Sequence, residues 1–268
     1  MKISRRRTIA LSDVTELDAP CGYPTIHRRV HHHSLGRDDL CSRAEEEYVF
    51  LYTALGDSIT AGDGAPSWAQ AYPSLVVSML EMRCSPATGE VLAQPGWTSA
   101  TLQGTVVEHS AMYLTEAKTI SIWVGGDDLA KAGIAVLGGA PPRVIEQSIV
   151  HYGKNIARLV LWVRKLSRAT VILCTQYNPF PNSPVAAEGV SALNAVTAEV
   201  AGRLGTVLAP VHAWFEGQQS ALIYGYRTGR LEDVLTSPQP PIHPNRQGHQ
   251  VIASHLAPMV LQRDAQTT

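Results

Sequence analysis

Apolar, strand-like runs alternate with helical patterns along almost the whole chain after Tyr48, and this alternation is the strongest constraint on the fold. Alternating strands and helices favour a parallel sheet with helices on both faces. The apolar runs predict strands over residues 49–54, 90–93, 119–124, 170–176 and 206–209. Helical periodicity predicts helices over about residues 69–83, 100–113, 143–166, 190–204 and 246–262.

A serine follows the first of these apolar runs. Ser58 lies in residues 55–60, LGDSIT, directly after the run over residues 49–54. A strand that ends in a tight glycine turn can aim a serine hydroxyl out of the sheet edge, with backbone N–H groups beside it. Nucleophilic acyl chemistry needs such a hydroxyl and such donors. Taken alone, the same tripeptide is also compatible with a serine that only caps a helix.

A histidine block near the C-terminus points to the same chemistry. Residues 242–249 read IHPNRQGH and precede an amphipathic stretch. Pro244 at a first helical position leaves His243 on the preceding loop, where it is free to reach the sheet edge. Histidine is the natural general base for a serine hydroxyl near neutral pH, although a surface histidine that caps the helix is the alternative. His249 lies inside the helical pattern, and we interpret it as structural.

Two further segments have glycine turns at the ends of apolar runs. Gly96, in residues 94–99 (QPGWTS), allows the backbone to approach a ligand closely and to offer its N–H group. Residues 121–128, SIWVGGDD, end an apolar strand in a glycine turn with polar side chains at its tip. Open α/β sheets place their sites at such strand ends. Each segment taken singly is also compatible with an ordinary loop.

These four blocks, in this order and spacing, resemble those of the SGNH, or GDSL-type, serine hydrolases over about residues 48–261. The resemblance implies a three-layer α/β/α sandwich with a flavodoxin-like, five-stranded parallel sheet. It implies that Ser58 is the nucleophile, that His243 is the base, and that the Ser58 and Gly96 N–H groups contribute to an oxyanion hole. The implied activity is metal-independent cleavage of carboxylic esters, as in esterases and lipases, with no cofactor.

The third block departs from the family pattern. The family usually reads Gly-x-Asn-Asp there, whereas residues 125–128 read GGDD, so Asp127 takes the place of the oxyanion-hole asparagine. An amide donates a hydrogen bond to a developing oxyanion, but an ionised carboxylate only accepts. Losing one such donor typically costs about 10²–10³ in rate. The alternatives are a protonated Asp127 and a side chain that only caps the following helix.

The usual acid of a catalytic triad is also missing. The family commonly has an acidic residue three positions before the base, and Pro240 stands there in this chain. We therefore expect a Ser58–His243 dyad in which a main-chain carbonyl of the proline-rich loop accepts from His243 Nδ1. Asp233 is the second choice for orienting the imidazole, and Glu232 is a further alternative.

Three aromatic residues near the blocks are candidates for a substrate pocket: Trp97, Phe180 and Trp214. The loops over residues 178–184 and 214–241 follow the fourth and fifth predicted strands, so they are natural walls for a cleft. For each aromatic side chain, ordinary packing is at least as good an interpretation.

The N-terminal segment differs from the rest of the chain. Residues 1–46 are rich in Arg and His and lack a sustained apolar period, so we expect a flexible extension. A hydrolase domain is expected over residues 47–262, with a tail over residues 263–268. The SRRR run at residues 4–7 is followed by too short an apolar segment for a signal peptide, which favours a cytoplasmic location. The three histidines at residues 31–33 are interpreted as a solvated polar run rather than a metal site.

Charge and cysteine content narrow the expected partners. The chain has 268 residues, with 22 Lys and Arg against 23 Asp and Glu, so no net field favours nucleic acid or an anionic membrane. No apolar run reaches the length of a transmembrane helix. The four cysteines show neither metal spacing nor a disulfide framework, and Cys174 is interpreted as a reduced core residue. We expect a small-molecule ester or lipid as the partner.

Other functions remain compatible with parts of the sequence. One is a catalytically weakened fold that binds acyl or glycan ligands without turnover, which the Asp127 position favours. Another is an esterase that removes O-acetyl groups from carbohydrate. A flavodoxin-like nucleotide-binding protein is disfavoured, because the chain has neither a Gly-x-x-x-x-Gly-Lys loop nor a Gly-x-Gly-x-x-Gly fingerprint.

Overall fold

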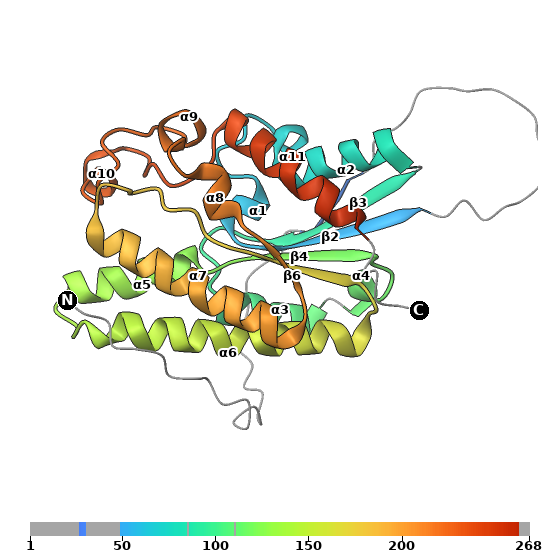
Figure 1. Cartoon of the computed structure of the whole chain (residues 1–268), viewed down its shortest axis with the longest axis horizontal. Coiled ribbons are helices and arrows are strands. Elements are labelled where there is room, and N and C mark those ends of the chain that lie inside the picture. The colour runs from blue at the N-terminus through green and yellow to red at the C-terminus, as the bar shows by residue number, and fades with distance from the viewer. Residues whose placement is uncertain (1–26, 31–48, 85, 110, 263–268) are drawn as a thin grey trace, which may run out of the picture.

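A computed structural model describes residues 27–30, 49–84, 86–109 and 111–262 of the chain. These residues form one sheet of six strands in the order β1-β3-β2-β4-β5-β6 (Figure 1). The strands are β1 His27–Val30, β2 Phe50–Gly56, β3 Ala87–Ala93, β4 Thr119–Trp123, β5 Thr170–Cys174 and β6 Val207–Ala209. Strands β2 to β6 are parallel, and β1 pairs antiparallel with β3.

The five parallel strands confirm the predicted α/β fold. Their spatial order places the first of them, β2, between the second and the third, which is the flavodoxin-like order. The edge strand β1 was not predicted, and it lies inside the segment expected to be a flexible extension. Four residues carry too little periodicity to predict a strand, and β1 pairs with residues far along the chain. The histidines at residues 31–33 and the SRRR run lie outside the described residues.

Helices cover both faces of the sheet (Figure 1). On one face lie α2 Tyr72–Cys84 and α11 Arg246–Leu261, and on the other lie α3 Ser99–His109, α6 Arg143–Leu166 and α7 Pro184–Leu204. The remaining helical elements of the described part of the chain are α1 Ser58–Ala61, the 3₁₀ helix η2 Trp68–Gln70, α4 Ala111–Thr115, α5 Gly126–Leu137, α8 Val211–Phe215, α9 Gln219–Leu222 and α10 Asp233–Thr236. The three-layer sandwich is therefore confirmed. None of the described helices is long and apolar enough to cross a membrane.

The predicted helices differ from the observed ones mainly at their ends. Helix α7 begins at Pro184, at its first helical position, and so takes in residues expected to be loop. The segment over residues 214–241, expected to be a loop, contains α9 and α10. Both are single turns of four residues, which is too short for a helical period to be visible in a sequence.

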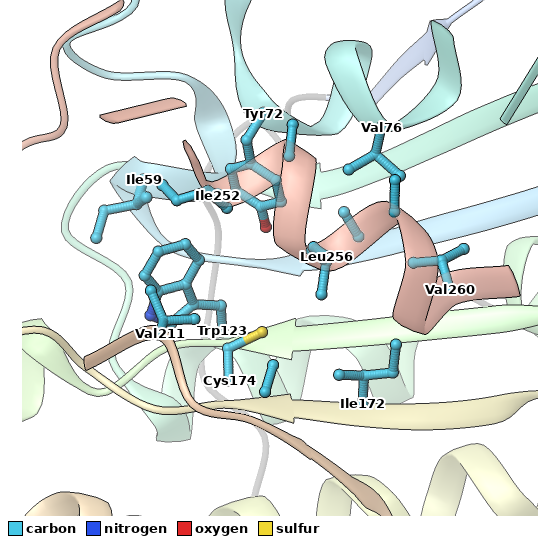
Figure 2. Close-up of a cluster of buried hydrophobic side chains, with 14 of the residues drawn as sticks. Ile59, Tyr72, Val76, Trp123, Ile172, Cys174, Val211, Ile252, Leu256 and Val260 are labelled. Atoms are coloured by element: carbon cyan, nitrogen blue, oxygen red, sulfur yellow. The ribbon is translucent and has the colours of Figure 1, made fainter. Parts of the chain in front are cut away.

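Two apolar clusters fill the space between the sheet and its helices. The first lies under α2 and α11 and includes Tyr72, Trp123 and Leu256 (Figure 2). The second lies under α3, α6 and α7 and includes Ile122 and Val160. Cys174 is a buried free cysteine in the first cluster, which confirms the core assignment, and burial raises the pKa of its thiol so that it stays protonated.

Gly56 ends β2 and fixes the direction of the chain into the next turn. A Cβ atom at this position would collide with the carbonyl oxygen of Trp123 on β4 and with the side chain of Thr60. Only glycine allows the backbone to pass so close to the neighbouring strand. The residues that follow therefore emerge at the carboxyl ends of β2 and β4, where the strand order reverses. This is where open α/β sheets bind their ligands.

Candidate active site

Ser58 is delivered by the turn that follows β2, and it does not cap the next helix. Asp57 is the N-cap of α1, and its carboxylate accepts from the Ile59 N–H group at 3.1 Å. Ser58 is the first residue of α1 and is half-buried. The helix-capping alternative for Ser58 is therefore wrong, and its hydroxyl is left for another partner.

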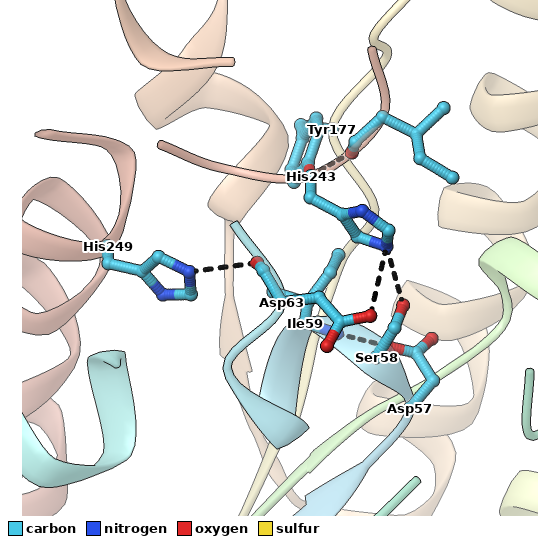
Figure 3. Close-up of polar contacts among 8 residues, drawn as sticks. Asp57, Ser58, Ile59, Asp63, Tyr177, His243 and His249 are labelled. Carbon is cyan, nitrogen blue, oxygen red and sulfur yellow. Dashed lines mark hydrogen bonds and ion pairs between the residues drawn. The ribbon is translucent and has the colours of Figure 1, made fainter. Parts of the chain in front are cut away.

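That partner is His243, 185 residues further along the chain. Its Nε2 lies 3.0 Å from Ser58 Oγ (Figure 3). Burial lowers the pKa of His243, and Asp63 partly offsets this effect. The imidazole is therefore neutral at pH 7, so Nε2 can accept the hydroxyl proton. The two blocks that the sequence analysis paired thus meet at hydrogen-bonding distance.

Backbone contacts on both sides hold the His243 loop in place. The Tyr224 N–H group donates to the His243 carbonyl at 2.9 Å, and the Tyr177 hydroxyl donates to the carbonyl of Ile242. The next helix begins at Arg246, as the helical pattern predicted, and not at Pro244: Asn245 is its N-cap and accepts from the Gly248 N–H group at 3.0 Å. His243 therefore lies on a loop, as predicted, rather than on a helix.

Neither of the partners expected for His243 Nδ1 reaches it. This buried nitrogen has no hydrogen-bond partner among the described residues. The carbonyl of Pro240 accepts instead from the Ile242 N–H group at 2.9 Å. The carboxylate of Asp233 accepts from the N–H groups of Thr228 and Gly229 and from the Thr228 hydroxyl, at 2.8–3.0 Å. The expected contact between His243 Nδ1 and a main-chain carbonyl is thus absent among the described residues. Asp233 instead stabilises the turn over residues 228–233.

Side-chain hydrogen bonds join the loop of Gly96, residues 94–99, to the start of α5. Gly96 has a φ of +83°, which favours glycine, and nothing lies within 4 Å of where its Cβ would be. Lys131 Nζ donates to the Gly96 carbonyl at 2.9 Å. Asp128 accepts from the Ser99 N–H group at 2.8 Å and from the Ser99 hydroxyl at 2.6 Å. The turn that carries Gly96 is therefore fixed against the start of α5.

Asp127 lies in the first turn of α5 and is half-buried. Burial raises the pKa of its carboxyl; Lys131 opposes this effect and Asp128 adds to it. Burial, followed by repulsion from Asp127, also raises the pKa of Asp57 well above its usual range. The side chain of Asp127 makes no hydrogen bond to any of the residues described.

The three aromatic candidates for the substrate pocket are packed elsewhere or buried. Trp97 is buried in the second apolar cluster. Trp214 is half-buried against the first cluster and stacks on His255, with 5.0 Å between the ring centroids. Phe180 is buried in the loop after β5. Ordinary packing is therefore the better interpretation for Trp97 and Trp214.

Two neighbours of the dyad were not predicted to take part. Asp63 Oδ2 lies 3.8 Å from His243 Nε2 (Figure 3). The carbonyl of Asp63 lies 3.1 Å from Nε2 of His249, whose Nδ1 accepts from the Tyr72 N–H group at 3.2 Å. Because Nδ1 is an acceptor, Nε2 must be the donor to Asp63. His249 is fully buried, which agrees with its structural interpretation.

The described residues contain no group of three or more His, Cys, Asp or Glu side chains arranged to hold a metal ion. The polar groups that meet at the sheet edge are a serine, a histidine and several carboxylates. In chemical terms, a serine hydroxyl beside a neutral imidazole is suited to act as a nucleophile with a general base.

Comparison with known proteins identifies the family of this chain. Residues 54–251 match the model of the GDSL-like lipase/acylhydrolase family. The spore germination lipase LipC of Bacillus licheniformis is 24% identical over 215 residues, which cover 76% of this chain and 93% of that protein. The chain belongs to the GDSL-like lipase/acylhydrolase family.

Solved structures show the same fold. The lipase Lip_vut3 from a goat rumen metagenome superposes with a TM-score of 0.68 at 21% identity, covering 80% of this chain and 99% of that one. The acetylxylan esterase Axe2 of Geobacillus stearothermophilus gives a TM-score of 0.58 at 17% identity, covering 83% and 98%.

The buried His249 predicts an acid-sensitive fold. Burial lowers its pKa from 6.5 to about 4, so the unfolded chain binds a proton that the folded chain rejects between these pH values. The stability contributed by the neutral imidazole is complete above pH 6.5 and is lost as the pH falls toward 4, by about 3 kcal/mol. His249→Gln does not titrate and should lack this loss. Urea unfolding of both proteins from pH 4 to 7 measures it, and parallel pH profiles would contradict the prediction.

The placement of Asp233 predicts that no carboxylate of this loop orients the base. Asp233→Asn should lower the melting temperature, because a neutral amide accepts fewer of the turn's three hydrogen bonds. Its kcat should fall less than about tenfold, whereas loss of a triad aspartate can cost about 10⁴. Glu232→Gln removes an exposed charge next to it and is the matched control. A loss of the larger size in either variant would restore a full triad.

Proposed function

We propose that this protein is a serine hydrolase that cleaves carboxylic esters through an acyl-enzyme on Ser58. The observation that carries the proposal is the distance of 3.0 Å between Ser58 Oγ and His243 Nε2. Membership of a lipase and acylhydrolase family supports it. A neutral histidine at this distance can take the hydroxyl proton as the oxygen attacks a carbonyl carbon.

The reaction follows from these two side chains. Ser58 Oγ forms a bond to the ester carbonyl carbon while its proton moves to His243 Nε2. His243 then gives this proton to the leaving alcohol oxygen as the carbon–oxygen bond breaks. A water molecule attacks the acyl-enzyme in the same way, with its proton taken by His243 and passed to Ser58 Oγ. The products are a carboxylic acid and an alcohol.

The developing negative charge on the carbonyl oxygen needs donors. The proposed donors are the Ser58 N–H group and the N–H group of Gly96, whose turn is fixed by Lys131 and by the contact of Asp128 with Ser99. Asp127 is the third member proposed for this hole. As a carboxylate it opposes the charge, and as a protonated carboxyl it can donate to the oxyanion.

A weakened, ligand-binding fold is the second candidate function, and Asp127 is the observation that favours it. The relatives include proteins named as a lipase and as an acetylxylan esterase, so lipid esters and acetylated sugars are both candidate substrates. Turnover of p-nitrophenyl esters of increasing chain length separates short-chain from lipid-like specificity. Binding of acylated ligands without any turnover would favour the weakened fold.

The nucleophile can be tested directly. A fluorophosphonate probe should label one site, Ser58, and Ser58→Ala should abolish both labelling and ester turnover, because among the described residues only the Ser58 hydroxyl hydrogen-bonds to His243 Nε2. Ser254→Ala, which removes an exposed serine of α11, should behave like the wild type. Peptide mass spectrometry locates the label. A label on another residue, or full activity in Ser58→Ala, would refute the mechanism.

Asp127 predicts that the chain is a poor esterase at neutral pH. Asp127→Asn should raise kcat by about 10²–10³ at pH 8, because an amide supplies the missing donor. KM should change less, since the donor acts on charge that appears in the transition state. Since the pKa of Asp127 is raised, its carboxyl is more often protonated at pH 5, and the gain should shrink there. Equal kcat values for the two proteins from pH 5 to 8 would show that Asp127 never meets the substrate.

A further inference from the structure

His243 has a carboxylate beside the nitrogen that faces the nucleophile. Asp63 Oδ2 lies 3.8 Å from Nε2, and the same Nε2 lies 3.0 Å from Ser58 Oγ (Figure 3). On the opposite side of the ring, Nδ1 is buried and has no partner in the part of the chain that the structure describes. In a full triad the acid lies on the Nδ1 side, so this arrangement places the negative charge differently.

The position of Asp63 is fixed by its own backbone. Its N–H group donates to the Ser58 carbonyl at 3.0 Å, and its carbonyl accepts from His249 Nε2 at 3.1 Å. The next residue, Gly64, has a φ of +86°, and a Cβ atom there would lie 3.1 Å from His243 Cβ and would collide with the carbonyl of Pro244. The turn after α1 therefore packs directly on the loop of the base. These contacts fix the backbone from which the Asp63 carboxylate reaches His243.

We propose that Asp63 is the positioning residue that stabilises the protonated form of His243 during ester cleavage. The inference rests on the proposed function, because only a proton moving from Ser58 Oγ to His243 Nε2 creates the positive charge that Asp63 meets. The carboxylate itself takes no proton. It lowers the energy of the imidazolium while the tetrahedral intermediate exists, and the proton then goes to the leaving oxygen.

The groups around His243 leave Asp63 as its counter-charge. His249 on α11 is buried, and its lowered pKa keeps it neutral. Tyr177, after β5, donates its hydroxyl to a backbone carbonyl, and burial raises its pKa. Asp57, before α1, directs its carboxyl to the Ile59 N–H group. Burial lowers the pKa of His243 and Asp63 raises it, which is the direction expected for a partner that favours the charged imidazole.

The test compares Asp63→Asn with the control Glu116→Gln. The control removes an exposed carboxylate just before β4, at the amino-terminal end of that strand, whereas Ser58 follows the carboxyl end of β2. The pKa of His243 is measured by NMR titration of histidine-labelled protein, with its signal assigned by its absence from His243→Gln. In Asp63→Asn this pKa should fall by about one unit, a tenfold loss of proton affinity. The acid limb of kcat/KM should move to lower pH by the same amount. Glu116→Gln should change neither quantity.

The second measurement is turnover. In Asp63→Asn, kcat should fall about 10- to 100-fold, which is less than the roughly 10²–10⁴ of a full acid–base contribution because Asp63 is partly exposed to solvent. KM should change less than about threefold, and Asp63→Glu should recover part of kcat. An unchanged pKa of His243 in Asp63→Asn would overturn the proposal. A lowered pKa with unchanged kcat would also overturn it, because the charge would then have no part in the reaction.

The failure of the proposed function would look different. If the wild type neither cleaved esters nor reacted with a fluorophosphonate, the ester hydrolase would be wrong, and the role of Asp63 in catalysis would fall with it. The NMR titration would still show whether Asp63 and His243 form an ion pair. Thermal unfolding of Asp63→Asn at pH 7 separates a local charge effect from damage to the fold: a melting temperature close to that of the wild type is expected.

Discussion

The arrangement of Ser58 and His243 depends on the contacts that join the first turns of α11 to the turn after β2. Asn245 caps the helix, and Gly248 lacks the Cβ that would collide with the Leu222 carbonyl. His249 then uses both ring nitrogens on the backbone, one on Tyr72 and one on Asp63. A buried histidine that leaves neither nitrogen unpaired is worth more to the fold than its packing alone, because the same two backbone groups would otherwise be buried without partners. These contacts set the distance between His243 and Ser58.

The sequence predicted those features that depend on local patterns. Buried parallel strands read as apolar runs, and the glycine turns after them are visible in single segments, so the sheet and the turns of Ser58 and Gly96 followed from the sequence. The edge strand β1 has four residues and takes its register from β3, so no local period reveals it. Asp63 was missed for a similar reason. The role proposed for it depends on a loop about 180 residues away, and no motif marks the position five residues after Ser58.

Three carboxyl groups, Asp57, Asp127 and Asp128, repel one another electrostatically, and two of them accept hydrogen bonds within the fold. Asp57 accepts from the Ile59 N–H group, and burial raises its pKa so that the proton is held more tightly. Asp128 accepts two hydrogen bonds from Ser99. Asp127 has only the charge of Lys131 to offset its burial. A half-buried carboxyl without a hydrogen-bonding partner in the described part of the fold is the group whose protonation responds most readily to what binds beside it.

In the proposed mechanism, Asp63 and Asp127 act in opposite directions. A negative Asp63 favours the imidazolium that forms as Ser58 loses its proton, whereas a negative Asp127 disfavours the oxyanion that forms at the same moment. Asp63 is 38% exposed, so water and salt screen its attraction for His243, and its effect must be smaller than that of a buried triad aspartate. In the proposed oxyanion hole a charged Asp127 opposes the developing oxyanion, whereas a protonated Asp127 can donate to it, so the proposed activity depends on the protonation of Asp127.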